Sequence, residues 1–133
     1  MKDIRIVVAG GRDFNVYDCV KITLDNYISQ IRITKLYKDL PFEEFINKVE
    51  IVSGGAKGAD SLGEKYASEQ GLTCTVFNAD WDKHGKAAGY IRNEEMAKYG
   101  THAVVFWDGE SKGSKHMIDL AKKHKLKTTI IPY

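Results

Sequence analysis

Short runs of β-branched residues, each ended by glycine or by a polar turn, alternate along this chain with segments of helical periodicity. Ile4–Ala9 is followed by Gly10-Gly11, and Val49–Ser53 is followed by Gly54-Gly55. Runs this short and this apolar fit strands buried on both faces better than they fit helices. Strands that alternate with helices imply right-handed crossovers and a parallel sheet covered on both faces. The pattern therefore predicts an α/β fold, a Rossmann-like three-layer sandwich with a five-stranded, mainly parallel sheet.

The individual elements follow from the same signals. We expect strands at residues 4–9, 49–53, 72–78, 103–107 and 128–131, and helices at residues 16–28, 58–70, 90–98 and 114–125. Asn15 is placed to cap the first helix, and Gly71 is placed to end the helix at 58–70. Residues 31–41 predict an extension of the first helix or a short further one, followed by a short helix that contains Phe42 and Phe45. Residues 79–89 are rich in glycine and in polar and aromatic groups, which predicts a binding loop.

Length and composition are those of one globular domain. With 133 residues, 43% hydrophobic and 29% charged, the chain is expected to form a single domain over residues 1–133. No stretch approaches the roughly 18 apolar residues of a membrane span, so we expect no membrane partner and a cytoplasmic location. Cys19 and Cys74 have no metal-ligand spacing and are expected to be reduced packing thiols.

The charge balance argues against nucleic acid as a partner. The 20 basic and 18 acidic side chains leave a net charge of +2, and lysines gathered late in the chain are typical of the solvated face of a helix. The histidines share no metal-ligand spacing, and no nucleophile with its base is evident. We therefore expect no metal and no required cofactor, and the sequence identifies no catalytic residue. The late lysines are Lys112, Lys115, Lys122, Lys123, Lys125 and Lys127.

The segment from Ser53 to Asp60 joins an apolar strand to a helical pattern through three glycines and a lysine. Such a turn presents backbone N–H groups and the positive end of a helix dipole to an anion, and an inward-pointing lysine adds charge. The segment is neither a P-loop nor G-x-G-x-x-G, and a tight turn without a ligand is the alternative. The residues that we expect to bind ligand here are Ser53, Gly54, Gly55, Ala56, Lys57, Gly58 and Asp60.

Two further glycine corners are expected at the same edge of the sheet. Arg12 can hold a phosphate bidentately or pair with a surface carboxylate, and Ser114 can cap a helix or bind a phosphate. Ligands of such sheets bind beyond the carboxyl ends of the strands, where the strand order reverses, so the three corners predict one composite nucleotide pocket. The residues that we expect to bind ligand from these two corners are Gly10, Gly11, Arg12, Asp108, Gly109, Ser111, Gly113 and Ser114.

Four more residues are candidates for the same pocket. Trp81 and Trp107 lie near strand ends, where an aromatic face can stack on a base, although packing in the core is an equal alternative. Arg92 and Asn93, near the start of a predicted helix, are candidates for an anion or ribose contact, and a place on the helix surface is the alternative.

Taken in order, these motifs resemble the YspA, cpYpsA-related branch of the SLOG superfamily. The resemblance covers almost the whole chain except about residues 31–45. It implies a Rossmann-like domain that binds a nucleotide or nucleotide-derived small molecule, as a sensor or sequestering module. Related proteins often pair through their helices, so a homo-oligomer and a monomer both stay open. The motifs that carry it are Gly10-Gly11-Arg12-Asp13-Phe14, Ser53–Asp60, Ala88-Gly89-x-x-Arg92-Asn93-x-x-Met96 and Phe106–Ser114.

The superfamily takes its name from the Smf/DprA DNA-processing proteins and the LOG phosphoribohydrolases, which supply two alternatives. LOG enzymes cleave the N-glycosidic bond of nucleoside monophosphates with a glutamate, and Met117 stands here where that glutamate would be. A hydrolase would need another carboxylate, from Asp60, Asp80, Asp108 or Glu110. Single-stranded DNA binding of the DprA type would use the late lysines. Binding of a nucleotide-like ligand is the leading prediction.

Overall fold

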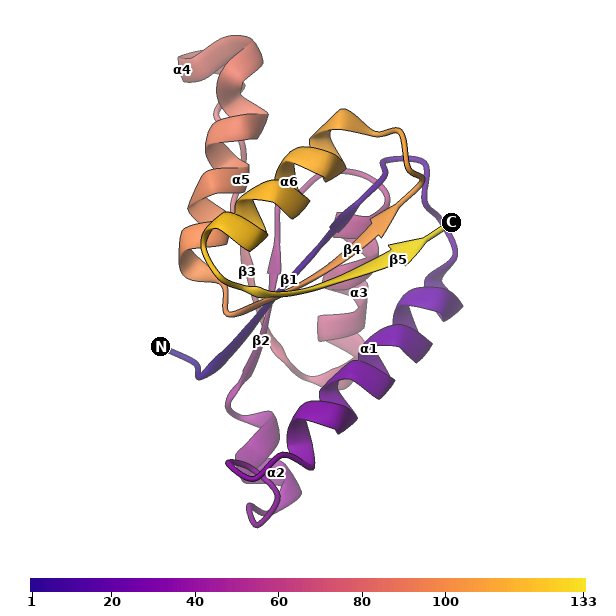
Figure 1. Cartoon of the computed structure of the whole chain (residues 1–133), viewed down its shortest axis with the longest axis vertical. Helices are drawn as coiled ribbons and strands as arrows, with labels where there is room; N and C mark the ends of the chain where they lie inside the picture. Colours follow the sequence, from indigo (N-terminus) through magenta and orange to yellow (C-terminus); the bar gives the residue numbers. More distant parts are fainter.

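The computed structural model describes residues 1–133 and contains one five-stranded sheet (Figure 1). The strands are β1 (Ile4–Gly10), β2 (Val49–Ser53), β3 (Thr73–Val76), β4 (His102–Trp107) and β5 (Lys127–Pro132). The helices are α1 (Tyr17–Arg32), α2 (Phe42–Ile46), α3 (Ala59–Gln70), α4 (Trp81–His84), α5 (Ala88–Tyr99) and α6 (Lys112–Lys123), with a 3-10 turn, η1 (Gly85–Ala87), between α4 and α5.

The sheet is entirely parallel, with the strand order β3-β2-β1-β4-β5. β1 lies at the centre and pairs with β2 on one side and β4 on the other. The first three strands form one half of the sheet, and the chain then crosses over β1 to place β4 and β5 on its other side. The strand order therefore reverses beside β1, which is where ligands bind in open sheets of this kind.

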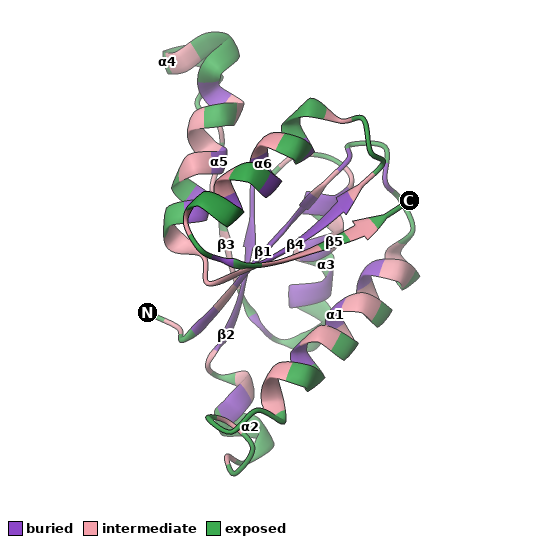
Figure 2. Ribbon diagram, viewed as in Figure 1, coloured by how far each residue is buried: buried purple, intermediate pink, exposed green.

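Helices cover both faces of the sheet, and alternate residues of β1 point into the two cores. Ile6 and Val8 pack with α1, α2 and α3, whereas Val7 and Ala9 pack with α5 and α6. Figure 2 shows the buried residues concentrated on the strands and the exposed ones on the outer sides of the helices. This is the three-layer α/β sandwich that the alternation of patterns predicts, with the five-stranded sheet in the middle.

Several local predictions need correction. α1 begins at Tyr17, and Val16, which precedes it, makes no side-chain cap, so Asn15 does not cap the helix. Residues 79–89 are largely helical rather than a loop, because the Asp80 carboxylate accepts from the Lys83 amide over 3.1 Å and starts α4. The helices predicted at residues 90–98 and 114–125 also begin two residues earlier, since α5 starts at Ala88 and α6 at Lys112.

The segment between α1 and α2 follows the first of the two alternatives that the sequence leaves open, and the short helix predicted around Phe42 and Phe45 is α2. α1 continues to Arg32, as an extension of the first helix requires, and residues 33–40 then form turns without a further helix.

Among the helices of the structure, none is both long and apolar enough to cross a membrane.

Gly63 allows α3 to lie close against β1. A Cβ atom at this position would stand 2.9 Å from the Cβ of Val8, a buried strand residue that has no room to move. We predict that Gly63→Ala lowers the free energy of unfolding by about 1–3 kcal/mol, the usual effect of overpacking a core.

The matched control is Gly113→Ala in α6, where an added Cβ meets nothing within 4 Å. Its unfolding free energy should stay the same or rise by up to about 1 kcal/mol, because alanine favours the helix over glycine. Urea denaturation measures both, and equal stabilities for the two variants would contradict the packing argument.

Candidate functional site

A cleft of about 530 Å³ lies beside β1 and β4. Its walls come from the turn after β1, the start of α3, the segment from α4 to α5 and the turn between β4 and α6. The volume falls within the range of roughly 300–1,000 Å³ that is usual for small-ligand sites. The residues that line it are Ala9, Gly10, Gly11, Arg12, Asp13, Ala56, Asp60, Trp81, Lys86, Gly89, Tyr90, Arg92, Asn93, Met96, Asp108, Ser111, Gly113, Ser114 and Met117.

The first wall is the turn that follows β1. Phe14 anchors it, because its buried ring stacks on that of Phe106 with centroids 4.9 Å apart. Gly58 packs directly against the backbone of Gly11 and Arg12, and it has a φ of +79°, so both the space and the conformation require glycine there. The turns after β1 and β2 are therefore locked together, and the exposed Arg12 side chain stands at the cleft.

The turn after β2 is filled from within by a carboxylate. Asp60 is only 5% exposed, and its Oδ2 accepts a long hydrogen bond from the Ala56 amide at 3.4 Å, while the Gly54 amide also points to this carboxylate. Ser53 Oγ accepts from the Gly55 amide, and the Ala59 amide donates to the Gly11 carbonyl. The amides that the sequence offers as an anion cradle at Gly54, Gly55 and Ala56 thus already have acceptors inside the protein.

Burial raises the pKa of Asp60 from 3.8 to about 6, although the nearby Arg92 guanidinium and the backbone amides oppose the shift. Arg92 reaches across from α5 and donates from Nη1 to the Gly54 carbonyl and from Nε to Oδ1 of Asn93. Desolvation and the charge of Arg12 lower the pKa of Arg92, and Asp60 partly offsets them. Two guanidinium groups therefore face the same cleft, with one buried carboxylate near them.

The turn between β4 and α6 forms the opposite wall. The Asp108 carboxylate accepts from the amides of Glu110 and Ser111, each over 2.8 Å, and these bonds lower the pKa of Asp108. Ser111 caps α6 by accepting from the Ser114 amide. The amide of Gly113, a residue that lines the cleft, donates to no protein acceptor. One N–H group at the start of α6 is thus free to meet a ligand.

The carboxylates that line the cleft have hydrogen-bond donors within the protein, whereas two of its cationic side chains have no partner. Asp13 accepts from the Tyr133 hydroxyl over 2.8 Å, and Asp60 and Asp108 accept from backbone amides. The cationic groups of Arg12 and Lys86 make no hydrogen bond or ion pair with the protein, and each of the chain's ion pairs joins other residues. The cleft consequently offers the positive charges of Arg12 and Lys86 to an incoming anionic group.

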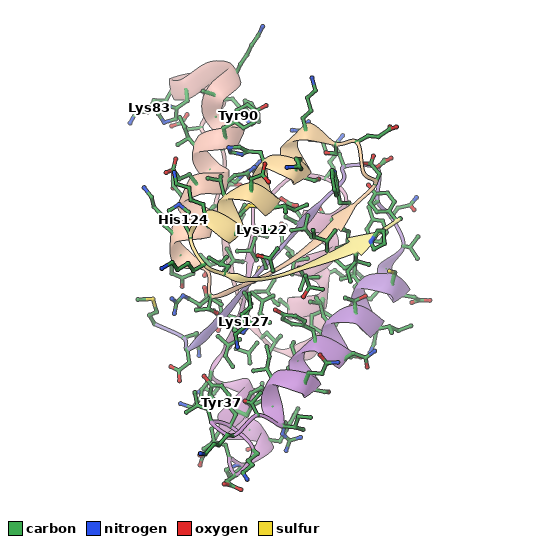
Figure 3. All side chains as sticks on the ribbon, viewed as in Figure 1. Tyr37, Lys83, Tyr90, Lys122, His124 and Lys127 are labelled. Atoms are coloured by element: carbon green, nitrogen blue, oxygen red, sulfur yellow. The ribbon has the colours of Figure 1, made fainter.

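The mouth of the cleft is aromatic and its floor is apolar. Trp81 and Tyr90 are about half exposed, at 51% and 49%, and both line the cleft. Figure 3 shows Tyr90 where α5 begins, next to α4, and its ring packs edge-on against that of His116. Met96 and Met117 are buried side chains that line the cleft from α5 and α6.

The structure brings most of the predicted binding residues to this cleft but not all of them. Those that line it are Gly10, Gly11, Arg12, Ala56, Asp60, Trp81, Arg92, Asn93, Asp108, Ser111, Gly113 and Ser114. Those that do not are Ser53, Gly54, Gly55, Lys57, Gly58, Trp107 and Gly109. Lys57 is exposed and lies outside the lining. The Trp107 indole donates to the Ser111 carbonyl over 3.1 Å, so it holds the β4–α6 turn instead of presenting a face to a base.

Sequence reasoning missed part of the lining, namely Ala9, Asp13, Lys86, Gly89, Tyr90, Met96 and Met117. Lys86 and Gly89 belong to the segment that the sequence singles out as a binding loop, which is the signal that would have found them. Of the carboxylates considered for hydrolysis, Asp60 and Asp108 line the cleft. Asp108 holds its own turn and Asp80 caps α4, whereas Glu110 is exposed outside the lining.

Comparison with known proteins supports the family and the fold. The profile of the YspA, cpYpsA-related SLOG family matches residues 4–84, more than half of the chain. The Gene 61 protein of Mycobacterium phage D29 is 38% identical over 79 residues, which cover 55% of this chain and 63% of the phage protein. The chain thus spans less than two thirds of that relative.

The fold has a counterpart among solved structures. DNA processing protein A (DprA) from Streptococcus pneumoniae superposes with a TM-score of 0.66 and 17% identity, over 99% of this chain and 51% of the DprA chain. At this identity the likeness concerns the fold alone.

The raised pKa of Asp60 makes a prediction about stability. Because the folded state holds this proton more tightly than the unfolded chain does, the contribution of Asp60 is most favourable below its ordinary pKa of 3.8 and is lost as the pH rises through about 6. The free energy of unfolding, measured in urea at about pH 4.5 and about pH 7.5, should therefore fall by about 2 kcal/mol more in the wild type than in Asp60→Asn.

Asp108→Asn is the control for this comparison. The pKa of Asp108 is lowered, so its contribution is lost only as the pH falls below the tested window, and the variant should run parallel to the wild type between the two pH values. If the unfolding free energy of Asp60→Asn changed between the two pH values by as much as that of the wild type, the Asp60 carboxylate would not be the desolvated group described above.

Proposed function

Because this chain belongs to the YspA, cpYpsA-related SLOG family, we propose that it binds a nucleotide or nucleotide-derived small molecule in the cleft beside β1 and β4. One observation carries the proposal. The Arg12 guanidinium stands at the cleft without a protein anion, close enough to lower the pKa of Arg92. Two guanidiniums held near each other repel, and an anion that both contact relieves that repulsion.

The anionic group of the ligand belongs at the corner between Arg12 and the start of α6. The Gly113 amide is free there, and the 12-residue α6 directs the positive end of its dipole toward the same corner. The exposed Lys86 adds a further positive charge at the cleft. A phosphate fits this donor set, because it accepts from guanidinium, ammonium and backbone N–H groups together.

The aromatic mouth gives the rest of the ligand a place. Trp81 and Tyr90 present exposed ring surface at the cleft, and a base that stacks on such a ring typically gains about 1–3 kcal/mol. An anionic corner next to an aromatic one suits a nucleotide better than inorganic phosphate, which has no apolar part to bury. As a sensor or sequestering module, the protein would act in the cytoplasm on such a ligand, without a required cofactor.

Replacing Arg12 tests this function. Calorimetry against nucleoside monophosphates, ADP-ribose, NAD and cyclic nucleotides should show saturable binding to the wild type. Arg12→Ala should weaken it by at least about tenfold, the usual effect of losing a hydrogen bond to a charged group.

Arg32→Ala is the matched control, because Arg32 lies at the end of α1 over the Phe42 ring, 4.8 Å from its centroid, and does not line the cleft. This variant should bind like the wild type. The absence of binding to every compound, or equal affinities for Arg12→Ala and the wild type, would count against the proposal.

A second candidate function is the binding of single-stranded DNA. Two observations favour it: the structural neighbour is a DNA processing protein, and the lysines at the end of the chain make no ion pair. These are Lys122, Lys123, Lys125 and Lys127, and Figure 3 labels Lys122 and Lys127 along α6 and the strand after it. A backbone phosphate can contact such lysines without any base-specific recognition.

Salt dependence tests this candidate. The affinity for an oligonucleotide should fall steeply with salt. Lys122→Ala/Lys123→Ala should reduce the slope of log affinity against log salt by about 1.4, since each of the two lost phosphate contacts on a single strand contributes about 0.7. Fluorescence anisotropy measures this slope. No binding at low salt, or a slope that the double variant leaves unchanged, would eliminate this candidate.

A further inference from the structure

Asp60 is a buried carboxylate that lines the ligand cleft but has no cation bonded to it. It is 5% exposed, and its hydrogen bonds come from backbone amides of its own turn, with Ala56 donating to Oδ2. No ion pair within 4.0 Å joins it to Arg92. An ionised carboxylate has about four positions that accept hydrogen bonds, so the amides leave acceptor capacity on the side of the cleft.

The carboxylate is held in one place by the residues around it. A Cβ at Gly54 would stand 2.7 Å from Asp60 Oδ2 and 2.8 Å from Arg92 Nη1, so the glycine is what lets both side chains approach the turn. Arg92 is fixed in turn by its bonds to the Gly54 carbonyl and to Asn93. Asp60 therefore presents a preorganised acceptor, which costs little entropy when a donor binds to it.

The charges around Asp60 decide what kind of group can approach it. Arg92 and Arg12 lie on the cleft side, and Glu64, one turn further along α3, adds a negative charge. A phosphate beside Asp60 would face a like charge at close range in a partly buried site, which is costly. Groups that donate hydrogen bonds, by contrast, satisfy the carboxylate without adding charge.

We propose that Asp60 accepts hydrogen bonds from the vicinal hydroxyls of a ribose, so that the ligand is a ribonucleotide whose sugar lies against the Ser53–Asp60 turn and whose phosphate lies between Arg12 and α6. The inference rests on the proposed nucleotide function and adds to it the identity of the sugar and the direction in which the ligand lies. It also reverses the role that the sequence gives to this turn, which becomes the sugar site and not the phosphate site.

The experiment compares ribonucleotides with their deoxy analogues. Calorimetry with the four ribonucleoside 5′-monophosphates and with the corresponding 2′-deoxy and 3′-deoxy compounds should show that the wild type prefers ribose by about tenfold or more, because a missing hydroxyl leaves a buried acceptor unpaired. In Asp60→Asn the amide turns its oxygen toward the turn amides and its NH₂ toward the cleft, so the preference should fall to about twofold or less.

Asp18→Asn, an exposed carboxyl in the first turn of α1, is the charge-matched control and should keep the wild-type preference. Should Asp60→Asn fail to fold, as circular dichroism would show, the wild-type comparison still decides. Equal binding of ribose and deoxy compounds by the wild type overturns the assignment of Asp60 and leaves nucleotide binding intact. Absence of binding to all of them overturns both proposals.

Discussion

The position of β1 in the middle of a parallel sheet is the constraint on which the rest of the structure depends. β1 pairs with β2 and β4 at once, so the chain must cross from one half of the sheet to the other after building β2 and β3. Because every connection returns the chain to the same end of the next strand, the turns after β1, β2 and β4 meet at one edge. The alternation of β1 side chains then supplies a core for helices on both faces, and α3, α5 and α6 start or pass beside the cleft.

Asp60 makes one side of this edge of the sheet a hydrogen-bond acceptor, whereas the other side is a hydrogen-bond donor. Its carboxylate satisfies the amides of Gly54 and Ala56, where a phosphate would otherwise be expected. Desolvation of that carboxylate is unfavourable, as its raised pKa indicates, and Arg92 compensates it only in part. The turn after β2 is thereby an acceptor, whereas the corner of Arg12 and α6 remains a donor. The proposed ribonucleotide, with its hydroxyl and phosphate groups, would be complementary to this arrangement.

The sequence predicts the fold well because buried strands require apolar, mostly β-branched residues, which are visible in the sequence. β1, β2 and β4 are nearly continuous runs of β-branched and aromatic residues, and each predicted strand is present in the sheet. The edge at which the glycine turns meet follows from the same alternation. Helix starts are predicted less well, since capping at Asp80 and the absence of a cap at Asn15 depend on local backbone geometry.

The site is predicted only in part, because residue types do not reveal where side chains point. The aromatic ring of Trp107 could stack on a base, yet its indole N–H donates a hydrogen bond to the Ser111 carbonyl. Lys57 lies in a motif typical of anion binding but is not part of the cleft lining. Tyr90 and Met117 reach the cleft from helices whose direction depends on packing between α5 and α6, which no local pattern encodes.

The most direct test of the central claim is to find which backbone amides respond to a bound nucleotide. A ¹H–¹⁵N NMR titration of the wild-type protein with ribonucleoside 5′-monophosphates measures this. We expect the largest shifts on Arg12 and Gly113, whose amides lie at the proposed phosphate corner. Shifts confined to Gly54, Gly55 and Ala56 would place the phosphate in the turn that Asp60 occupies and would contradict the claim.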